Sequence, residues 1–389
     1  MKIVYASCAM SKSRFFETFT EFDRMPGQQV QKYHRLMLSG LAGNEVKVVA
    51  LTAAPITRRT ARGLLFRLAD DIEDGVEYRF LPILNIPILK NLLVFLTCFF
   101  RTCRAVCREK DTIVICHVLD FSVATGALFA ARLCRRPSVG IVTDLPRHLN
   151  GRSGVRAGLT ERVMREYSYY LFLTEEMNQV VNRRGVPYVV IEGQVDTGMA
   201  GIVNEMSAKH MKRICLYAGS VHRKYGIQAL VDGFILAELP NSELHIYGSG
   251  DYVEELIAIS TQDPRVKYFG VMPNSEVIEE ELKATLLINP RPTDKEFVRF
   301  SFPSKNLEYM VSGTPVLTTH LPGMPDEYLP YVYLIHDESA SGIADSLGMT
   351  LRKGREELHA RGAAAKNFAL ERKGNIAQAR RVLEMVETG

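Results

Sequence analysis

Short runs rich in Val, Ile and Leu alternate with longer stretches of helical periodicity along most of the chain. The clearest runs are KIVYAS (2–7), EVKVVALT (45–52), DTIVICHV (111–118), SVGIVTDL (138–145), RICLYAG (213–219), ELHIYGSG (243–250), RVKYFGV (265–271), TLLINP (285–290) and TPVLTT (314–319). Continuous apolar strands separated by helices indicate parallel sheets that are covered on both faces. Two such series predict an α/β protein with two doubly wound, Rossmann-like domains.

The boundary between the two series is expected at 193–212, where the chain is irregular and rich in glycine. We therefore predict an amino-terminal domain over residues 1–195 and a carboxy-terminal domain over 205–371. The tail has the pattern of one or two helices broken near Lys373-Gly374. Its last part, 372–389, is expected to form a helix that packs back on the first domain.

The composition is that of a soluble globular protein. The chain has 389 residues, of which 47% are hydrophobic and 24% charged, and this length suggests more than one domain. Its seven cysteines are scattered and include no C-x-x-C pair, which argues against a zinc site or a disulfide framework. The start, MKIVYASCAM, lacks the long apolar segment of a secretory signal. These features predict a cytoplasmic protein with reduced thiols.

Positive charge is concentrated in the first half of the chain. Residues 1–190 hold 27 Lys/Arg against 17 Asp/Glu, whereas residues 191–389 hold 21 against 27. The first half is therefore expected to face something anionic, such as phospholipid, nucleic acid or a phosphorylated substrate.

The segment LPILNIPILKNLLVFLTCFFRTCRAVCREK (81–110) is strongly apolar and also carries a basic stripe. Helical spacing puts the following side chains on a common face: Lys90, Thr97, Arg101, Arg104 and Arg108. Its longest uncharged stretch is shorter than the roughly 20 apolar residues of a membrane span. Two interpretations stay open: a helix lying in the interface of an anionic membrane, or a buried helix of the first domain with one solvent-exposed edge.

Three motifs in the second half suggest ligand chemistry. YAGSVHRKYGIQALVDGF (217–234) joins a small-residue turn and two cations to a helix start, which suits a phosphate group; the alternative is a routine strand–turn–helix. LHIYGSGDY (244–252) ends a strand with Gly248 and Gly250 but lacks the full G-x-G-x-x-G, so a nicotinamide fingerprint is not supported. FPSKNLEYMVSGTP (302–315) fits either an ordinary surface helix or a ligand site.

Taken in order and spacing, five motifs carry a family resemblance: GSVHRKYGI, IYGSGD, YFGVMPNSEV, INPRP and FPSKNLEYMVSGTPV. They resemble the nucleotide-sugar half of the family 4 retaining glycosyltransferases, strongly over about 213–320 and more loosely over the first half. The branch that the chain resembles serves bacterial capsule, exopolysaccharide and lipopolysaccharide synthesis. The resemblance implies the GT-B fold, in which an acceptor-side domain and a nucleotide-sugar-binding domain face each other across a cleft.

The resemblance assigns roles in the second domain. Glu308 would accept hydrogen bonds from the ribose hydroxyls, which suits an acceptor-only carboxylate. Arg223 and Lys224 would stabilise the departing diphosphate, and Met272 and Pro273 would line the base pocket. The remaining donor-binding residues would act through main-chain groups and the helix N-terminus; they are Gly219, Ser220, Gly248, Gly250, Ser301, Phe302, Pro303, Ser304 and Lys305.

Two departures from the family pattern stand out. The family commonly has a glutamate that contacts the sugar eight positions before Glu308, where this chain has Phe300, and Glu296 is out of register. The usual Arg-Leu after the first glycine is replaced by Ser220-Val221. Backbone amides would therefore have to do more of the sugar binding.

In the first domain the resemblance implies a one-glycine version of the family's turn, with Gly27 and Gln28 placed for the donor phosphate or the acceptor. His117 matches the histidine that reaches the donor hexose or the reacting centre, and its alternative is a core histidine. Asp144 would meet an acceptor hydroxyl, or else cap a turn. Glu192 and Asp196 occupy the family's domain-junction motif.

The resemblance implies a retaining transferase that moves a sugar, expected from a UDP-sugar, to a glycan or polyprenyl-diphosphate-linked acceptor. No nucleic-acid partner is implied. The sequence contains no Asp-x-Asp and no evident nucleophile–base pair, so we expect no metal cofactor, and we expect the leaving diphosphate to take the acceptor's proton. Two alternatives remain: an epimerase or hydrolase of the same fold acting on sugar nucleotides, and a catalytically silent nucleotide-sugar-binding subunit.

Overall fold

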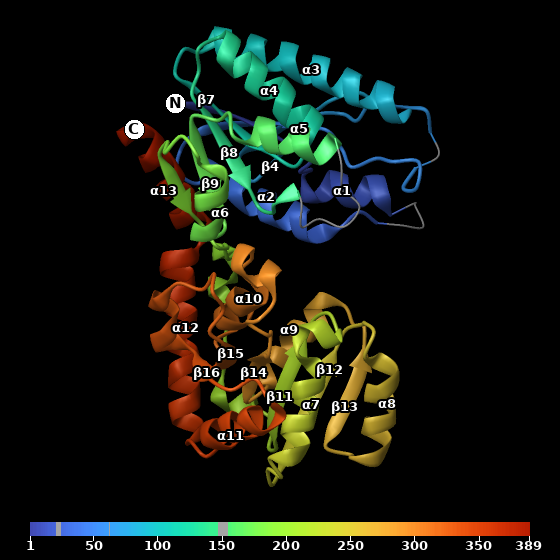
Figure 1. Ribbon diagram of the computed structural model, residues 1–389, viewed down its shortest axis with the longest axis vertical. Coiled ribbons are helices and arrows are strands. Elements are labelled where there is room, and N and C mark those ends of the chain that lie inside the picture. The colour runs from blue at the N-terminus through green and yellow to red at the C-terminus, as the bar shows by residue number, and fades with distance from the viewer. Residues whose placement is uncertain (21–24, 62, 147–154) are drawn as a thin grey trace. The chain divides into compact units, whose positions relative to one another are not determined.

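A computed structural model describes residues 1–20, 25–61, 63–146 and 155–389. The chain forms two compact units (Figure 1). The first comprises Met1–Gln194 together with Asn375–Gly389, and the second comprises Val195–Gly374. The chain thus leaves the first unit at Gln194 and returns to it at Asn375, between its last two helices.

The first unit contains an eight-stranded sheet in the order β10-β9-β8-β7-β1-β2-β5-β4. Its strands are β1 (Lys2–Ser7), β2 (Lys47–Thr52), β4 (Asp71–Glu73), β5 (Val76–Phe80), β7 (Thr112–His117), β8 (Ser138–Val142), β9 (Tyr169–Phe172) and β10 (Tyr188–Val190). All neighbouring strands are parallel except β4, which runs antiparallel to β5. Strands β3 (Leu65–Phe66) and β6 (Ile83–Leu84) form a small second sheet.

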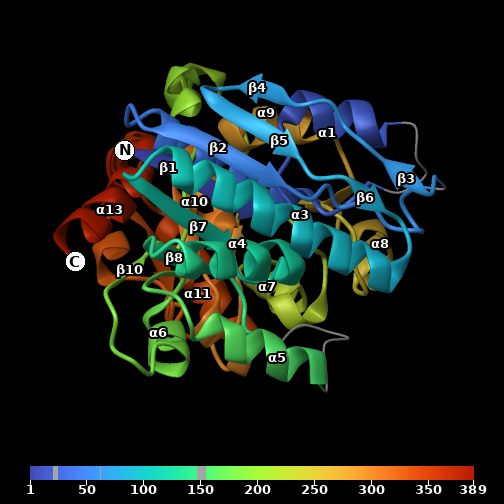
Figure 2. The same cartoon turned by 90° about the horizontal axis from the view of Figure 1, so that it is seen from above.

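Helices cover this sheet, as its continuous apolar strands require. They are α1 (Lys12–Phe19), α2 (Gln28–Ala42), α3 (Pro87–Arg108), α4 (Phe121–Leu133), α5 (Val155–Met164), α6 (Glu175–Val181) and α13 (Asn375–Thr388). Figure 2 shows α3 and α4 side by side over the sheet. Helix α13 packs on α2 so closely that a Cβ at Gly40 would lie 2.2 Å from the carbonyl oxygen of Asn375.

The second unit contains a six-stranded, wholly parallel sheet in the order β13-β12-β11-β14-β15-β16. Its strands are β11 (Arg213–Ala218), β12 (Ser242–Tyr247), β13 (Val266–Gly270), β14 (Leu286–Asn289), β15 (Val316–Thr319) and β16 (Tyr333–Ile335). Its α-helices are α7 (Ile227–Leu236), α8 (Val253–Gln262), α9 (Asn274–Lys283), α10 (Ser304–Ser312), α11 (Ala340–Leu351) and α12 (Arg355–Lys373). Short 3₁₀ turns are η2 (Thr197–Gly201), η3 (Met206–Ala208), η4 (Arg223–Tyr225), η5 (Glu296–Phe300) and η6 (Asp326–Tyr331).

The alternation of buried strands and helices is confirmed, as is the break in the tail between α12 and α13. The antiparallel edge strand β4 and the β3–β6 pair were not expected from the periodicity. Because all strands of the second sheet are parallel, their carboxyl ends meet at one edge. The motifs after β11, β12, β13 and β14 therefore meet at that edge.

Candidate functional sites

Helix α10 is fixed to the carboxyl edge of the second sheet by buried polar contacts. The Tyr309 hydroxyl accepts a 2.8 Å hydrogen bond from the Ala218 N–H and donates to the Ala218 carbonyl at 3.2 Å. Asn306 is fully buried, accepts a 2.7 Å bond from Asn289 Nδ2 and donates to Thr318 Oγ1 at 3.3 Å. These side chains tie α10 to β11, β14 and β15, so its first turn has a fixed position at the sheet edge.

The first turn of α10 offers backbone donors and a charged pair. Pro303 stands at the N-cap and makes no side-chain cap, so the N–H groups of Ser304 and Lys305 are not capped from within the helix. Lys305 Nζ lies 2.9 Å from Glu308 Oε2, and both side chains are about one-third exposed (29% and 31%). Burial opposes the charge on Lys305, but Glu308 and Glu281 hold its pKa above the ordinary value. The turn could receive an anion, with the carboxylate of Glu308 one turn further along.

The glycines after β11 and β12 serve backbone packing. Gly248 has φ +128°, and a Cβ there would lie 1.8 Å from the carbonyl oxygen of Gly219. A Cβ at Gly250 would lie 2.0 Å from the carbonyl oxygen of Val221, and one at Gly226 (φ +81°) would lie 2.1 Å from that of Pro290. These glycines are therefore required by the close approach of neighbouring loops, which is a reason independent of any ligand.

The two predicted cations beside these loops have different surroundings. The Arg223 guanidinium stacks 4.8 Å from the Tyr252 ring centre, pairs with Glu255 at 2.6 Å and also contacts Gln228. Lys224 is exposed, and its ammonium lies 5.0 Å from the centre of the Tyr225 ring. Arg223 is thus engaged by α8, and a diphosphate would have to compete with Glu255 for it.

Other predicted donor residues lie along the same sheet edge. Ser220 is exposed, and its carbonyl accepts a 3.0 Å bond from the Tyr217 hydroxyl. Met272 is partly buried against the core, and the exposed Pro273 forms the N-cap of α9. Phe302 and Pro303 are buried, so the turn before α10 can contribute mainly its backbone.

Arg291, in the NPRP motif, has no role in the sequence prediction but lies beside this turn. Its Nη2 donates a 3.0 Å hydrogen bond to Ser301 Oγ, and its guanidinium lies 5.6 Å from the centre of the Tyr225 ring. Burial lowers the pKa of this guanidinium. The motif itself was the available signal, because an arginine placed directly after a strand end reaches the ligand edge of a parallel sheet.

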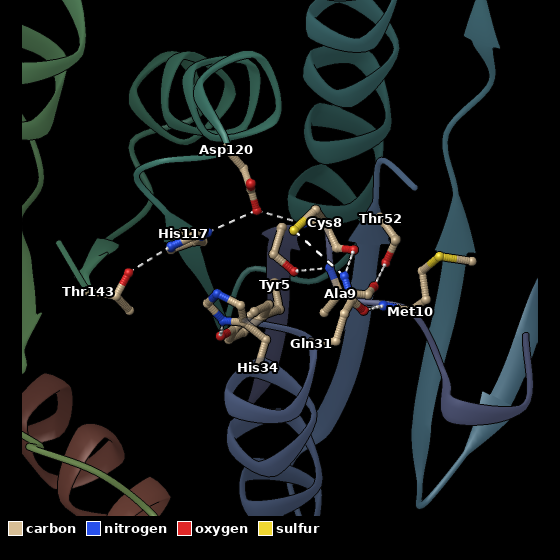
Figure 3. A network of polar contacts seen from close by, with 11 residues as sticks. Tyr5, Cys8, Ala9, Met10, Gln31, His34, Thr52, His117, Asp120 and Thr143 are labelled. Carbon is tan, nitrogen blue, oxygen red and sulfur yellow. Dashed lines mark hydrogen bonds and ion pairs between the residues drawn. The ribbon is translucent and has the colours of Figure 1, made fainter. Parts of the chain in front are cut away.

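In the first unit His117 lies at the end of β7 within a polar network (Figure 3). Its Nδ1 lies 3.0 Å from Asp120 Oδ2, and its Nε2 lies 3.1 Å from Thr143 Oγ1. The carboxylate can only accept, so the Nδ1–H donates to Asp120, and in the neutral form of the ring Nε2 accepts from the Thr143 hydroxyl. We call Tyr5, His34, His117, Asp120 and Thr143 the His117 cluster.

No nucleophile–base pair is evident in the sequence, yet the structure brings a hydroxyl, an imidazole and a carboxylate into one series. Asp120 also accepts a 2.6 Å bond from the Cys8 N–H. Although burial opposes its charge, His117 and this N–H together lower the pKa of Asp120 to about 2. The carboxylate is therefore ionised at neutral pH and holds the imidazole in one orientation.

His34 and Tyr5 form the buried inner part of the His117 cluster. The His34 ring centre lies 4.3 Å from that of His117, and its Nδ1 lies 2.6 Å from the Tyr5 hydroxyl. Burial, followed by the proximity of His117, lowers the pKa of His34 well below its usual range. Burial raises the pKa of the Tyr5 hydroxyl well above the usual range of tyrosine. Both side chains are thus neutral, and they support His117 without adding charge.

Asp120 and Thr143 were missed from the sequence. Asp120 follows His117 by three residues in HVLD, and Thr143 precedes the predicted Asp144. Residues that follow adjacent parallel strands lie at one sheet edge, so β7 and β8 were a usable signal for the pair. Asp144 is exposed, two residues beyond the end of β8.

The remaining predictions for the first unit fall at element boundaries. Gly27 is the N-cap of α2 with φ −55°, and a Cβ there would meet nothing within 4 Å. Gln28 is the first residue of α2 and is exposed. Glu192 is buried near the end of the unit. In the second unit, Asp196 caps η2 by accepting a 2.8 Å bond from the Gly198 N–H, which is a structural role.

The predicted basic stripe on 81–110 is only partly a surface feature. Lys90 Nζ donates to the Ile56 carbonyl, and Arg101 Nη1 donates to the Phe80 carbonyl at 3.0 Å. These two cations anchor α3 to its own unit, although Arg101 is still exposed, as are Arg104 and Arg108. Within the described ranges no helix has the length and apolar character needed to cross a bilayer. The same ranges contain no group of three or more His, Cys, Asp or Glu side chains placed to hold a metal ion.

Comparison with known proteins places the whole chain in one fold. Sucrose-phosphate synthase from Thermosynechococcus elongatus superposes with a TM-score of 0.66 at 14% identity, over 100% of this chain and 99% of the other. HepE from Anabaena in complex with UDP superposes with a TM-score of 0.62 at 15% identity, over 100% of both chains. The lipopolysaccharide outer core galactosyltransferase WaaB superposes with a TM-score of 0.63 at 15% identity, over 100% of this chain and 99% of the other. The chain has the GT-B fold.

The sequence comparison covers a smaller part of the protein. Residues 212–353 match the family model described as glycosyl transferases group 1. This range lies inside the second unit and includes α10 and the loops after β11 and β12. Among curated protein sequences none matches the chain.

Proposed function

We propose that the protein is a retaining glycosyltransferase that takes a sugar from a nucleotide-sugar donor, in the first instance a UDP-sugar. The observation that carries the proposal is the α10 entrance, by which we mean Ser301–Lys305 together with Glu308. There a helix start without a side-chain cap and a carboxylate that is about one-third exposed lie at the carboxyl edge of a parallel sheet, within the range that matches the family model. Structures that share the fold were solved with UDP and with UDP-glucose.

The proposed acceptor is a glycan or a polyprenyl-diphosphate-linked sugar of a surface polysaccharide. Support comes from the motif branch that the chain resembles and from the fold it shares with a lipopolysaccharide galactosyltransferase. Such an acceptor would place the protein in the cytoplasm, peripherally on the inner face of the cell membrane. The excess of positive charge in residues 1–190 agrees with that location.

Retention of configuration and independence from metal are part of the same proposal. Cations and N–H dipoles stabilise a departing diphosphate without requiring a strong base. The sequence contains no Asp-x-Asp, so Lys224, the backbone donors of the α10 entrance and Arg223, once released from Glu255, would bear that task. Transfer in the presence of EDTA and the anomeric configuration of the product, read by NMR, test these two points separately.

One observation favours a second candidate, hydrolysis of the donor. Thr143, His117 and Asp120 are hydrogen-bonded in series, an order that activates a hydroxyl in many hydrolases. Transfer is still preferred, because the five motifs of the second half resemble those of glycosyltransferases and residues 212–353 match the model of glycosyl transferases group 1.

One experiment separates the candidates. Purified protein is incubated with a panel of labelled nucleotide sugars, with and without a lipid extract from cells that make surface polysaccharide. Label that moves into the lipid fraction supports transfer, and loss of donor without any acceptor supports hydrolysis. Donor binding without turnover, under conditions where added acceptor is confirmed intact, overturns both and leaves a silent binding subunit.

A further inference from the structure

Helix α3 exposes a row of apolar side chains on the side away from its unit. The residues that it buries are spaced by four: Val94, Cys98, Thr102 and Val106. The residues two positions before them point the opposite way and include Leu92 (53% exposed), Leu96 (40%) and Phe100 (65%). One turn earlier Ile88 is 82% exposed. Exposed apolar residues are normally scattered, so a continuous row marks a surface that meets something else.

The apolar row continues onto α4. A series of ring contacts runs from Phe100 through Phe99 and Phe95 to Phe129, with centre distances of 5.3, 6.5 and 6.1 Å. The two helices approach closely because Gly126 faces the carbonyl oxygen of Phe95, where a Cβ would lie at 2.6 Å. Phe129 and Leu133 of α4 are 49% and 70% exposed. We call the exposed side chains of both helices the α3–α4 face.

The α3–α4 face has one sign of charge. Pro87–Arg108 contains four Lys/Arg and no Asp or Glu, and Phe121–Leu133 contains only Arg132, which pairs with Glu166. Arg104 and Arg108 are exposed and make no ion pair within the described residues. Cys107 Sγ lies 3.9 Å from Cys134 Sγ, so the carboxyl ends of the two helices meet, and they bring the exposed Arg135 to the same end. Apolar side chains thus occupy the body of the face and arginines its end.

We propose that the α3–α4 face docks on the surface of an anionic lipid bilayer, with its apolar row among the acyl chains and its arginines at the headgroups. A bilayer interface matches both features, since it buries apolar area and attracts cations. A second copy of the chain would match only the apolar row, because two such faces would bring positive charges against each other. The proposed function enters only as the reason for the contact: a lipid-linked acceptor lies at such a surface.

Flotation of the full-length protein with vesicles tests the inference. Vesicles of phosphatidylcholine alone are compared with vesicles containing 30% phosphatidylglycerol, at low and high salt. We expect co-flotation with the anionic vesicles, reduced by salt. Leu92→Ser/Phe100→Ser should weaken binding by at least about tenfold at either salt concentration. Arg104→Gln/Arg108→Gln should weaken it by about tenfold at low salt and remove most of the salt dependence.

The matched control is Leu236→Ser/Ile257→Ser, which changes two apolar side chains of similar exposure (57% and 51%) on helices of the second unit. This variant should float like the wild type, and circular dichroism and thermal melting should show that all variants fold. Flotation unchanged by the α3–α4 variants, or no flotation of the wild type, overturns the inference. A wild-type dimer that Leu92→Ser/Phe100→Ser converts to monomer would also overturn it and assign the face to self-association. Nucleotide-sugar binding measured without vesicles is independent of these outcomes, so failure of the proposed function would be recognised separately.

Discussion

His117 in the first unit is 3% exposed and has hydrogen-bond partners at both ring nitrogens, whereas Glu308 in the second unit is 31% exposed and pairs with a half-buried lysine. The His117 cluster is complete without a ligand, and a substrate hydroxyl that reached Nε2 would have to replace Thr143. The α10 entrance instead presents the first N–H groups of a helix whose N-cap residue, Pro303, makes no side-chain cap. The His117 cluster is organised by side chains that hydrogen-bond one another, whereas the α10 entrance is organised by a backbone turn whose position is fixed.

The loops also differ in what holds them. In the second unit Gly219 and Gly248 meet backbone to backbone, while in the first unit the segment after β1 is held by side chains, with Gln31 bonding Cys8 and Met10. A substitution that adds one methyl group should therefore be severe at Gly248 in the loop after β12 and mild at Gly27 before α2, where a Cβ would meet nothing within 4 Å. Loss of one polar side-chain atom should instead destabilise the segment after β1 more than the glycine loops of the second unit.

The largest expected effect is that of Gly248→Ala. The new Cβ would lie 1.8 Å from the Gly219 carbonyl oxygen, at a φ of +128° that side chains rarely adopt. We expect a loss of about 3–4 kcal/mol in the free energy of unfolding, from strain together with displacement of the loop. Urea unfolding followed by circular dichroism measures it.

The matched substitution in the first unit is Gly27→Ala, where the Cβ would meet nothing within 4 Å at a φ of −55°. Its effect on stability should lie within about 1 kcal/mol of zero and on the stabilising side. A Gly248→Ala protein as stable as the wild type would show that the loops do not meet as described.

The second prediction concerns Asp120→Asn. The pKa of Asp120 falls from 3.8 to about 2 in the folded protein, which corresponds to about 2 kcal/mol of stability. Because the folded pKa is the lower one, this stability is present above about pH 4 and is lost as the pH falls towards 2. The variant should be less stable than the wild type at pH 7, and the two should converge near pH 2 in urea titrations.

Asp144→Asn is the control for loss of an exposed carboxylate, because Asp144 follows the neighbouring strand and is exposed. It should change stability by less than about 0.5 kcal/mol. A constant difference between wild type and Asp120→Asn across the whole pH range would contradict the assigned pairing with His117.

These positions show what the sequence could and could not predict. The strand and helix pattern, the GT-B fold and the helix that carries Glu308 follow from periodicity and from motifs that are local in the chain. Asp120 was missed because its partners, Cys8 and Thr143, lie on two other loops that only the sheet order brings together. Lys90 and Arg101 were assigned to a surface stripe because helical spacing does not reveal that carbonyls of other segments accept their hydrogen bonds.

The glycines teach the same lesson. Gly248 and Gly250 end a strand in a pattern typical of ligand crevices, and a short segment cannot distinguish a ligand from a neighbouring loop as the reason for a missing side chain. The structure supplies that reason in the carbonyls of Gly219 and Val221. A role in donor binding remains a prediction for both glycines.

The third prediction is a pH dependence that originates at His34. Its folded pKa lies well below the unfolded value of about 6.5, so the unfolded chain binds the extra proton first. Stability contributed by the neutral ring is present above that value and is lost as the pH falls below it, by up to about 1.4 kcal/mol per pH unit. Tyr5, Tyr33, His117 and Asp120 face this ring; after burial, the proximity of His117 adds to the lowering of the His34 pKa, and the carboxylate of Asp120 opposes it.

The measurement is the difference in unfolding free energy between wild type and His34→Gln from pH 7.5 to 5. The wild type should lose more stability than the variant across this interval. Parallel curves would mean that His34 does not resist protonation in the folded state. They would contradict the interpretation that the buried ring of His34 is neutral.

The smallest expected effect, and the most direct on function, is that of Glu308→Gln on donor binding. The amide keeps the shape of the carboxylate but loses its charge and one acceptor oxygen, so bonds from two ribose hydroxyls would weaken by about 1–2 kcal/mol, or about tenfold in affinity. Isothermal calorimetry with UDP measures the change. Because Glu308 is about one-third exposed and pairs with Lys305 across one helical turn, stability should change by less than about 0.5 kcal/mol. Lys353→Gln, which breaks the exposed pair with Glu357 in the same unit, is the control and should leave UDP affinity unchanged. Equal affinities in all three proteins would remove Glu308 from the proposed donor site and leave the backbone of the α10 entrance as its remaining support.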